Sequence, residues 1–155
     1  MANSAARCIE MLPAGRYPKI SIHDPGTGRS AVLLNPDRAE VRRIQMDGCL
    51  APEGNASADF VLSLRTVIDV IVELKGKNVD HAVEQIESTR VYWSQHAEYD
   101  TGQAISAWIV CKEYPRVNRK VKKYQEKLRS LGGILKVTTK NGEERAFTEF
   151  IPQRP

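Results

Sequence analysis

Cysteine is scarce in this chain. Cys8, Cys49 and Cys111 stand far apart among 155 residues, and no two of them have the C-x-x-C spacing of a zinc site. Their odd number and wide separation also indicate no disulfide framework. The cysteine content therefore fits a protein of the reducing cytoplasm.

Long apolar segments are absent as well. The start, "MANSAARCIEMLPAGR" (1–16), lacks the apolar segment of a secretory signal, and no stretch approaches the roughly 20 apolar residues of a transmembrane helix. There is no internal repeat and no low-complexity segment. We therefore expect a soluble, cytoplasmic protein without a membrane partner, folded as a single domain over 1–155.

The composition is ordinary for a globular protein, but the charge is basic. Hydrophobic residues make up 41% of the chain and charged residues 27%, which is enough for a packed core. The net charge of +4 fits a polyanionic partner only if the basic residues are clustered.

Alternating apolar residues predict an α/β domain with a mixed sheet. We expect strands at 19–24, 30–35, 40–48, 58–64, 67–75 and 104–113. Residues 19–35 and 134–150 are each expected to form a hairpin, the second turned by Asn141-Gly142.

Two helices are predicted from apolar residues at helical spacing. The first covers 78–96, with Asn78 as the residue that caps its start. The second covers 116–133 and ends at Gly132-Gly133. Its buried stripe is expected to comprise Val117, Val121, Tyr124, Leu128 and Leu131.

The predicted strand "VIDVIVELK" (67–75) carries acids inside an apolar run. Side chains alternate between the two faces of a strand. One face therefore holds only apolar residues: Ile68, Val70, Val72 and Leu74. The other face holds Asp69, Ile71, Glu73 and Lys75.

The pairing of this strand with 58–64 decides where the acids lie. A hairpin brings the two apolar sets together only if its loop has an odd number of residues. A three-residue loop, 65–67, pairs Leu64 with Ile68 and places Asp59 directly across from Glu73. A two-residue loop would put Asp59 on the core side, where an unpaired carboxylate is unfavourable.

Carboxylates that face each other across two strands repel, by up to about 1 kcal/mol. A divalent cation between Asp59 and Glu73 would offset the repulsion, and carboxylate oxygens suit Mg²⁺ or Mn²⁺. Lys75 adds one positive charge on the same face. The sequence therefore predicts a metal site.

The motif formed by Asp59, thirteen residues and then Glu73-Leu74-Lys75 resembles the PD-(D/E)XK nuclease superfamily. The likeness covers 47–110, and the motifs "MDGCL", "ADFVL", "VELKG" and "HAVEQI" resemble small stand-alone bacterial members. The resemblance implies a restriction-endonuclease-like mixed sheet flanked by helices.

The same resemblance implies a function for individual residues. Asp59, Glu73 and Lys75 would be catalytic, and Asp59, Glu73 and the Leu74 carbonyl would hold the metal. Lys75 would orient or activate the attacking water. The reaction would be metal-dependent hydrolysis of phosphodiester bonds by an endonuclease, with DNA as the expected substrate.

Several other residues are candidates for supporting roles or depart from the family pattern. Ala58 stands where the family often has Pro, and Thr89 where some branches have Tyr. Asp69 is expected at the rim or beside an arginine, and Asp47 is expected in a turn. Four residues are candidates for a supporting role at the site: Glu40, Asp47, His81 and Gln85.

Basic residues cluster in the second predicted helix. The candidates for contact with nucleic acid are Arg116, Arg119, Lys120, Lys122, Lys123 and Lys127. A solvated helix face explains the same pattern, so both interpretations stay open.

Two functions from different classes fit the sequence. The first is a nuclease, acting as a homodimer or within a larger defence complex. The second is a catalytically silent nucleic-acid-binding or interaction subunit of a defence or mobile-element complex. Retention of Asp59, Glu73 and Lys75 together favours the nuclease.

Overall fold

A computed structural model describes residues 7–24, 26–75, 78–96, 103–114 and 118–153, except for the side chain of Lys75. Its strands are β1 (Ile9–Leu12), β2 (Lys19–His23), β3 (Ser30–Leu34), β4 (Val41–Gln45), β5 (Phe60–Leu64), β6 (Ile68–Lys75), β7 (Ile105–Cys111), β8 (Leu135–Thr138) and β9 (Glu143–Ala146). Its helices are α1 (Val79–Ser94) and α2 (Arg119–Ser130), with a wide turn at Met46–Leu50 and a 3₁₀ helix at Phe147–Phe150.

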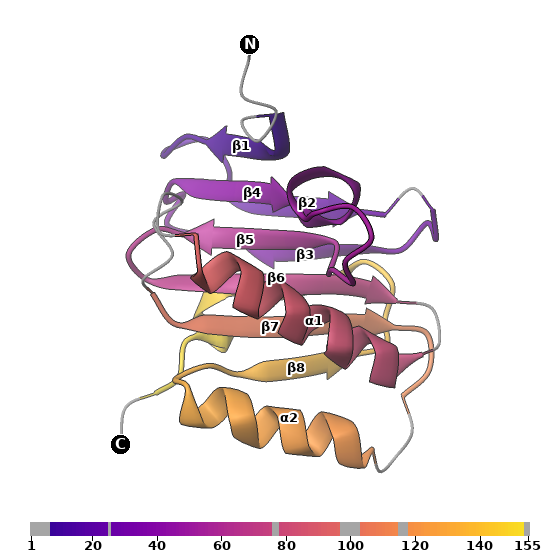
Figure 1. The fold of residues 1–155 in the computed structure, drawn as a ribbon. Helices are drawn as coiled ribbons and strands as arrows, with labels where there is room; N and C mark the ends of the chain where they lie inside the picture. The colour runs from indigo at the N-terminus through magenta and orange to yellow at the C-terminus, as the bar shows by residue number, and fades with distance from the viewer. Residues whose placement is uncertain (1–6, 25, 76–77, 97–102, 115–117, 154–155) are drawn as a thin grey trace.

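The strands form two mixed sheets. The larger has six strands in the order β1-β4-β5-β6-β7-β8, antiparallel from β1 to β6 and parallel from β6 to β8 (Figure 1). The smaller has three, with β3 between antiparallel β2 and parallel β9. The α/β class is therefore confirmed.

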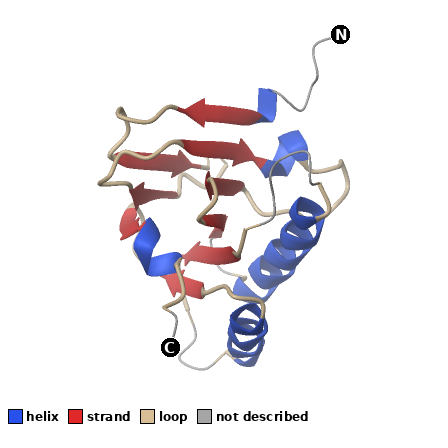
Figure 2. Ribbon diagram, turned by 90° about the vertical axis from the view of Figure 1, so that its left-hand side faces the viewer, coloured by secondary structure: helices blue, strands red, loops and turns tan. Residues whose placement is uncertain are grey.

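The layers differ from the expected sheet flanked by helices. Helices α1 and α2 pack on one face of the larger sheet, and the smaller sheet and the 3₁₀ helix cover the other face (Figure 1, Figure 2). The physical reason is that residues 19–34 and 143–150 supply the apolar side chains that bury this second face.

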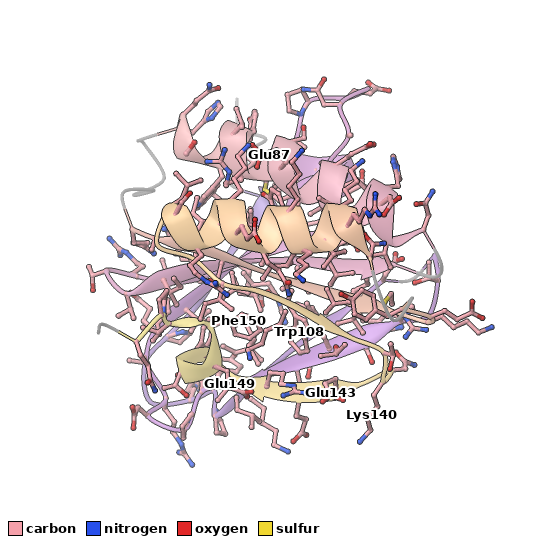
Figure 3. All side chains as sticks on the ribbon, turned by 90° about the horizontal axis from the view of Figure 1, so that it is seen from below. Glu87, Trp108, Lys140, Glu143, Glu149 and Phe150 are labelled. Carbon is pink, nitrogen blue, oxygen red and sulfur yellow. A yellow bond between two sulfur atoms is a disulfide. The ribbon has the colours of Figure 1, made fainter. Side chains whose placement is uncertain are left out.

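Both faces of β6 are consequently buried. Val70 contributes to the core between the sheets, and Ile71 contributes to the core beneath the helices. Trp108 and Phe150 fill the space between the sheets, with their ring centroids 5.6 Å apart (Figure 3). The face that carries the acids is therefore an interior face.

The two expected hairpins have different outcomes. β2 and β3 pair as an antiparallel hairpin, as predicted. The prediction for 134–150 is wrong, because β8 pairs with β7 whereas β9 pairs with β3. The Asn141 side chain accepts a hydrogen bond from the Ser30 N–H at 2.8 Å, which fastens the turn to the smaller sheet.

The first helix begins after the cap that the sequence predicts, Asn78, whereas the second is capped by Asn118, which was not predicted and lies two residues beyond the expected start. Asn78 accepts a hydrogen bond from the His81 N–H, and Asn118 accepts one from the Val121 N–H. The predicted buried face of α2 is confirmed for Val121, Tyr124 and Leu128.

The end of α2 differs from the prediction in one residue. Leu131 is 51% exposed because the helix ends at Ser130, and Val117 lies outside the described residues. Gly132 follows with a φ of 86°, and a side chain at Gly133 would collide with the Ile105 carbonyl. The glycine pair therefore lets the chain pass close to the start of β7 before it enters β8.

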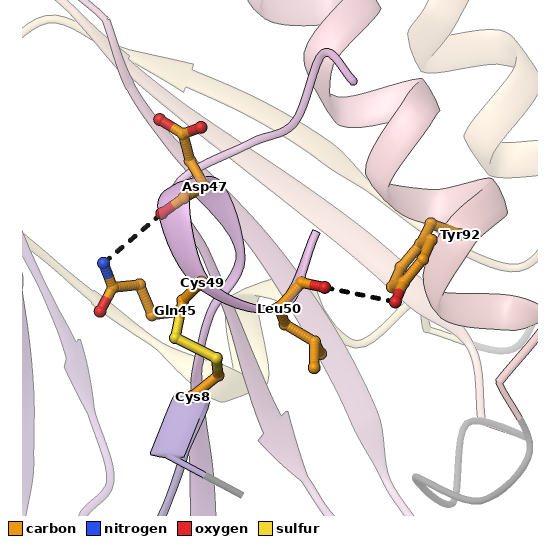
Figure 4. Close-up of a disulfide and its surroundings, with 6 residues drawn as sticks. All are labelled: Cys8, Gln45, Asp47, Cys49, Leu50 and Tyr92. Atoms are coloured by element: carbon orange, nitrogen blue, oxygen red, sulfur yellow. Dashed lines mark hydrogen bonds between the residues drawn. A yellow bond between two sulfur atoms is a disulfide. The ribbon is translucent and has the colours of Figure 1, made fainter. Parts of the chain in front are cut away.

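A disulfide joins Cys8, just before β1, to Cys49 in the turn Met46–Leu50 (Figure 4). The expectation of a chain without disulfides is wrong, because folding brings these two Cα atoms to 5.6 Å from each other. Cys111 stays a buried free thiol. The cysteines therefore no longer support the predicted cytoplasmic location.

No helix in the described ranges has the length and apolar character needed to cross a membrane.

Replacing Cys49 with Ser should lower the free energy of unfolding by about 4 kcal/mol, because the disulfide restricts the unfolded chain across a large loop. Equilibrium denaturant unfolding measures the change. As the matched control, wild type with a dithiol reductant should unfold like Cys49→Ser, and the reductant should not affect the variant. Equal midpoints for oxidised wild type and Cys49→Ser would contradict a stabilising disulfide.

Candidate active site

The candidate site lies at the end of β6, where the hairpin with β5 brings two carboxyl groups together. β5 and β6 have the predicted register, with Leu64 across from Ile68 and Phe60 across from Val72. One step further, Asp59 stands across from Glu73, and their carboxyl groups are within hydrogen-bonding reach. The juxtaposition predicted from the apolar pattern is therefore present.

Backbone hydrogen bonds fix Asp59 in this position. The Leu74 N–H donates to Asp59 Oδ2 at 2.8 Å, so the strand that carries Glu73 also orients the Asp59 carboxyl. The Asp59 carbonyl accepts the Met46 N–H at 2.9 Å, which ties the residue to the end of β4. Three strands thus determine where this side chain lies.

Burial controls the electrostatics of the pair. Glu73 is only 2% exposed, and Asp59 is half-buried. Burial raises the pKa of the Asp59 carboxyl above its ordinary value, and this effect exceeds the opposing effect of the hydrogen bonds with Glu73 and Leu74. The pair therefore favours either a shared proton or a nearby positive charge.

Two further acids add negative potential at Asp59. Asp24, in the turn between β2 and β3, and Asp47 both raise the Asp59 pKa by charge repulsion. Asp47 occupies the predicted turn before Gly48, which has a φ of 72°, and accepts a hydrogen bond from the Ser57 hydroxyl at 3.3 Å. Sequence reasoning missed Asp24, because nothing in its local pattern shows that the smaller sheet brings this turn to the site.

Within the described ranges, no group of three or more His, Cys, Asp or Glu side chains could hold a metal ion. Asp59 and Glu73 remain as a two-carboxylate pair. Mg²⁺ in enzymes commonly uses one or two carboxylates and takes its other ligands from water and substrate phosphate. The pair is compatible with such an ion.

Two other predicted members of the site come from β6 and α1. The Lys75 side chain lies outside the described part of the structure, although its backbone pairs with Cys111 of β7. Gln85 donates to the Ser57 carbonyl at 3.2 Å, so it contacts the segment that leads into Asp59.

Two other candidates for a supporting role contact charged groups outside the pair. His81 is exposed and faces Glu84, with 3.5 Å between Nδ1 and Oε2. Glu40 precedes β4 and lies 3.7 Å from Arg65, at the opposite end of the strands from Asp59. Glu40 therefore cannot support this site, because the length of β5 separates it from the carboxyl pair.

Asp69 has a structural role on the same face of β6. It is fully buried, so its expected place at the rim is wrong. Its carboxylate accepts hydrogen bonds from Trp93 Nε1 at 2.8 Å and Gln103 Nε2 at 2.7 Å. Burial raises the pKa of Asp69, while hydrogen bonds from Ser63 and these two donors, and the charge of Arg42, oppose that shift.

Gln103 connects Asp69 to the hairpin loop. Its Oε1 accepts the Thr66 N–H at 3.1 Å, and its Nε2 also donates to the Leu64 carbonyl at 3.3 Å. Thr66 has a φ of 67°, which is unfavourable for a β-branched residue. Gln103 therefore holds a strained loop in place. The sequence did not predict this role, because Gln103 lies in a polar connecting segment and its partners are distant in sequence.

The predicted basic cluster divides into two sets on α2. Lys120 and Lys127 form ion pairs with Glu84 and Glu87 of α1. Arg119, Lys122 and Lys123 are exposed, whereas Arg116 lies outside the described residues. The two sets thus differ in their partners, because only Lys120 and Lys127 form ion pairs with α1 among the described residues.

Comparison with known proteins gives no relative. No family model, no curated protein and no solved structure matches the chain.

Replacing Asp69 with Ala should lower the free energy of unfolding by about 3 kcal/mol, because Trp93 and Gln103 lose a buried acceptor. Denaturant unfolding of Asp69→Ala, Gln103→Ala and the double variant measures the coupling. We expect the double variant to be less destabilised than the sum of the single variants. Simple additivity would contradict a shared network.

Proposed function

We propose that this protein is a metal-dependent endonuclease that hydrolyses phosphodiester bonds in DNA. The observation that carries the proposal is the Asp59–Glu73 carboxyl pair, which the β5–β6 register places at the end of a parallel strand. Paired acids without a cation would repel a phosphate, so the pair suits phosphate chemistry only together with a metal ion.

The connectivity around the pair supports this proposal. The antiparallel hairpin β5–β6 leads into α1, and the chain returns as β7 parallel to β6. This is the strand, strand, helix, strand order that the PD-(D/E)XK resemblance implies. The restriction-endonuclease-like fold and membership of that superfamily are part of the proposal.

Mg²⁺ or Mn²⁺ would be held by the Asp59 and Glu73 carboxylates, with the Leu74 carbonyl as a further ligand. When bound, such an ion supplies Lewis-acid polarisation of the phosphate and increases the acidity of a bound water. The Leu74 N–H keeps the Asp59 carboxylate oriented. Lys75, two residues beyond Glu73 in the sequence, would orient the attacking water.

A specific observation favours the second candidate, a catalytically silent nucleic-acid-binding or interaction subunit. Glu73 is 2% exposed, and the Asp59 pKa is raised. A shared proton between these carboxyl groups would stabilise the sheet without any ion. The metal requirement of hydrolysis separates the two candidates.

Purified protein should nick supercoiled plasmid DNA in Mg²⁺ or Mn²⁺ and show no nicking in EDTA. Glu73→Gln and Lys75→Ala should each reduce the rate on the order of 100-fold or more, since each removes a group that the reaction requires. Agarose-gel separation of nicked and supercoiled DNA measures the rate.

Glu144→Gln is the matched control, because Glu144 is an exposed acid whose ion pair with Lys19 is also exposed. It should cut like wild type. Nicking that persists in EDTA, or at wild-type rate in Glu73→Gln, would rule out the proposed site. Linear duplex, branched and single-stranded DNA and RNA in the same assay identify the substrate.

A further inference from the structure

The positive charge of this protein is concentrated on α2. Six basic residues and one acid, Glu126, give the segment Arg119–Ser130 a net charge of +5, which exceeds the +4 of the whole chain. The remainder of the chain is therefore close to neutral. The basic character is a property of one helix rather than of the surface in general.

Two of the six basic residues have a structural explanation. Lys120 pairs with Glu84, and Lys127 Nζ lies 2.8 Å from Glu87 Oε1. Hydrogen bonds, first from Arg90 and then from Lys127 and Tyr124, lower the pKa of Glu87 to about 2. These pairs fasten α2 to α1.

The other four basic residues face solvent. Arg119, Lys122, Lys123 and Arg129 are exposed and form no ion pair with other described residues. We call these four residues the α2 stripe. From Arg119 to Arg129 the helix advances by about 15 Å.

The fold itself gains nothing from the start of this stripe. The first turn of α2 contains no acid and carries Arg119 and Lys122 beside the positive end of the helix dipole. Arg119 and Lys123 are also like charges at i,i+4 spacing, which is unfavourable in a helix. Stability alone would select acids at these positions, so the basic residues indicate an anionic partner.

The stripe begins at the edge of the sheet that carries the carboxyl pair. β6 and β7 end side by side, with Lys75 in register with Cys111, and α1 and α2 follow these strands (Figure 1). Asn118 Nδ2 donates to Asp80 Oδ1 at 2.9 Å, which holds the starts of the two helices together. A bound polymer could therefore reach both the stripe and the pair.

We propose that the α2 stripe binds the phosphate backbone of duplex DNA and reads no bases. The choice of DNA as the polyanion rests on the proposed function. Arginine and lysine contacts to phosphate position a nucleic acid without sequence information. Such contacts release counterions, so the binding should weaken steeply as salt increases.

Fluorescence anisotropy with a labelled DNA duplex, in EDTA and from about 50 to about 200 mM salt, tests this proposal. The variant Arg119→Ala/Lys122→Ala/Lys123→Ala should reduce the slope of log affinity against log salt by about 2 to 3. Its melting temperature should equal or exceed that of wild type, because unfavourable charges have been removed.

The matched control removes the same charge elsewhere. Arg16→Ala/Lys19→Ala/Arg38→Ala changes three exposed basic residues away from α2 and should change the slope by less than about 1. Equal loss of slope in both variants would overturn the proposal in favour of a net-charge effect. An unchanged slope in the α2 variant, or binding of heparin without binding of DNA, would also overturn it.

Binding in EDTA does not depend on hydrolysis. Salt-dependent binding through α2 without any nicking would refute the nuclease alone. Metal-dependent nicking with an unchanged slope in the α2 variant would refute the stripe alone.

Discussion

The register of the β5–β6 hairpin is the constraint on which the rest of the structure depends. With Leu64 across from Ile68, Leu62 and Val70 enter the core between the sheets, while Val61 and Ile71 enter the core beneath the helices. A shift of one residue would exchange the two faces of a strand. The same register places Asp59 beside Glu73.

This register depends on a loop that is unfavourable by itself. Thr66 adopts a φ of 67°, and the Gln103 side chain bonds its N–H while also bonding Asp69 on β6. The acids of β6 consequently have different roles, although they share one face. Asp69 is satisfied by neutral donors and stabilises the loop, whereas Glu73 meets a second carboxyl group. That difference in partners makes Glu73 the candidate for metal chemistry.

Local patterns in the sequence were enough to predict the elements and the register around the site. Alternation of apolar residues predicted the β5–β6 pairing, and Asn78 caps the first helix as predicted. The partner of β9 was not predictable. Asn141-Gly142 specifies a turn, but it does not specify which strand β9 pairs with after the turn. Its pairing with β3 depends on residues more than 100 positions away in sequence.

Contacts that folding creates between distant segments were also beyond prediction. The Cys8–Cys49 disulfide spans 41 residues, and the Gln103 contacts with Ser63 and Asp69 span more than 30. Each depends on the side-by-side placement of segments that have no shared local pattern. The carboxyl pair was predictable because a hairpin is a local structure, whereas the added charge of Asp24 required the smaller sheet.

Anomalous diffraction from Mn²⁺-soaked crystals tests the proposed metal site most directly. The account predicts an anomalous peak within coordination distance of both the Asp59 and Glu73 carboxylates, and loss of that peak in Glu73→Gln. A map without a peak at the pair, or one in which the two side chains point to opposite faces of the sheet, would contradict it.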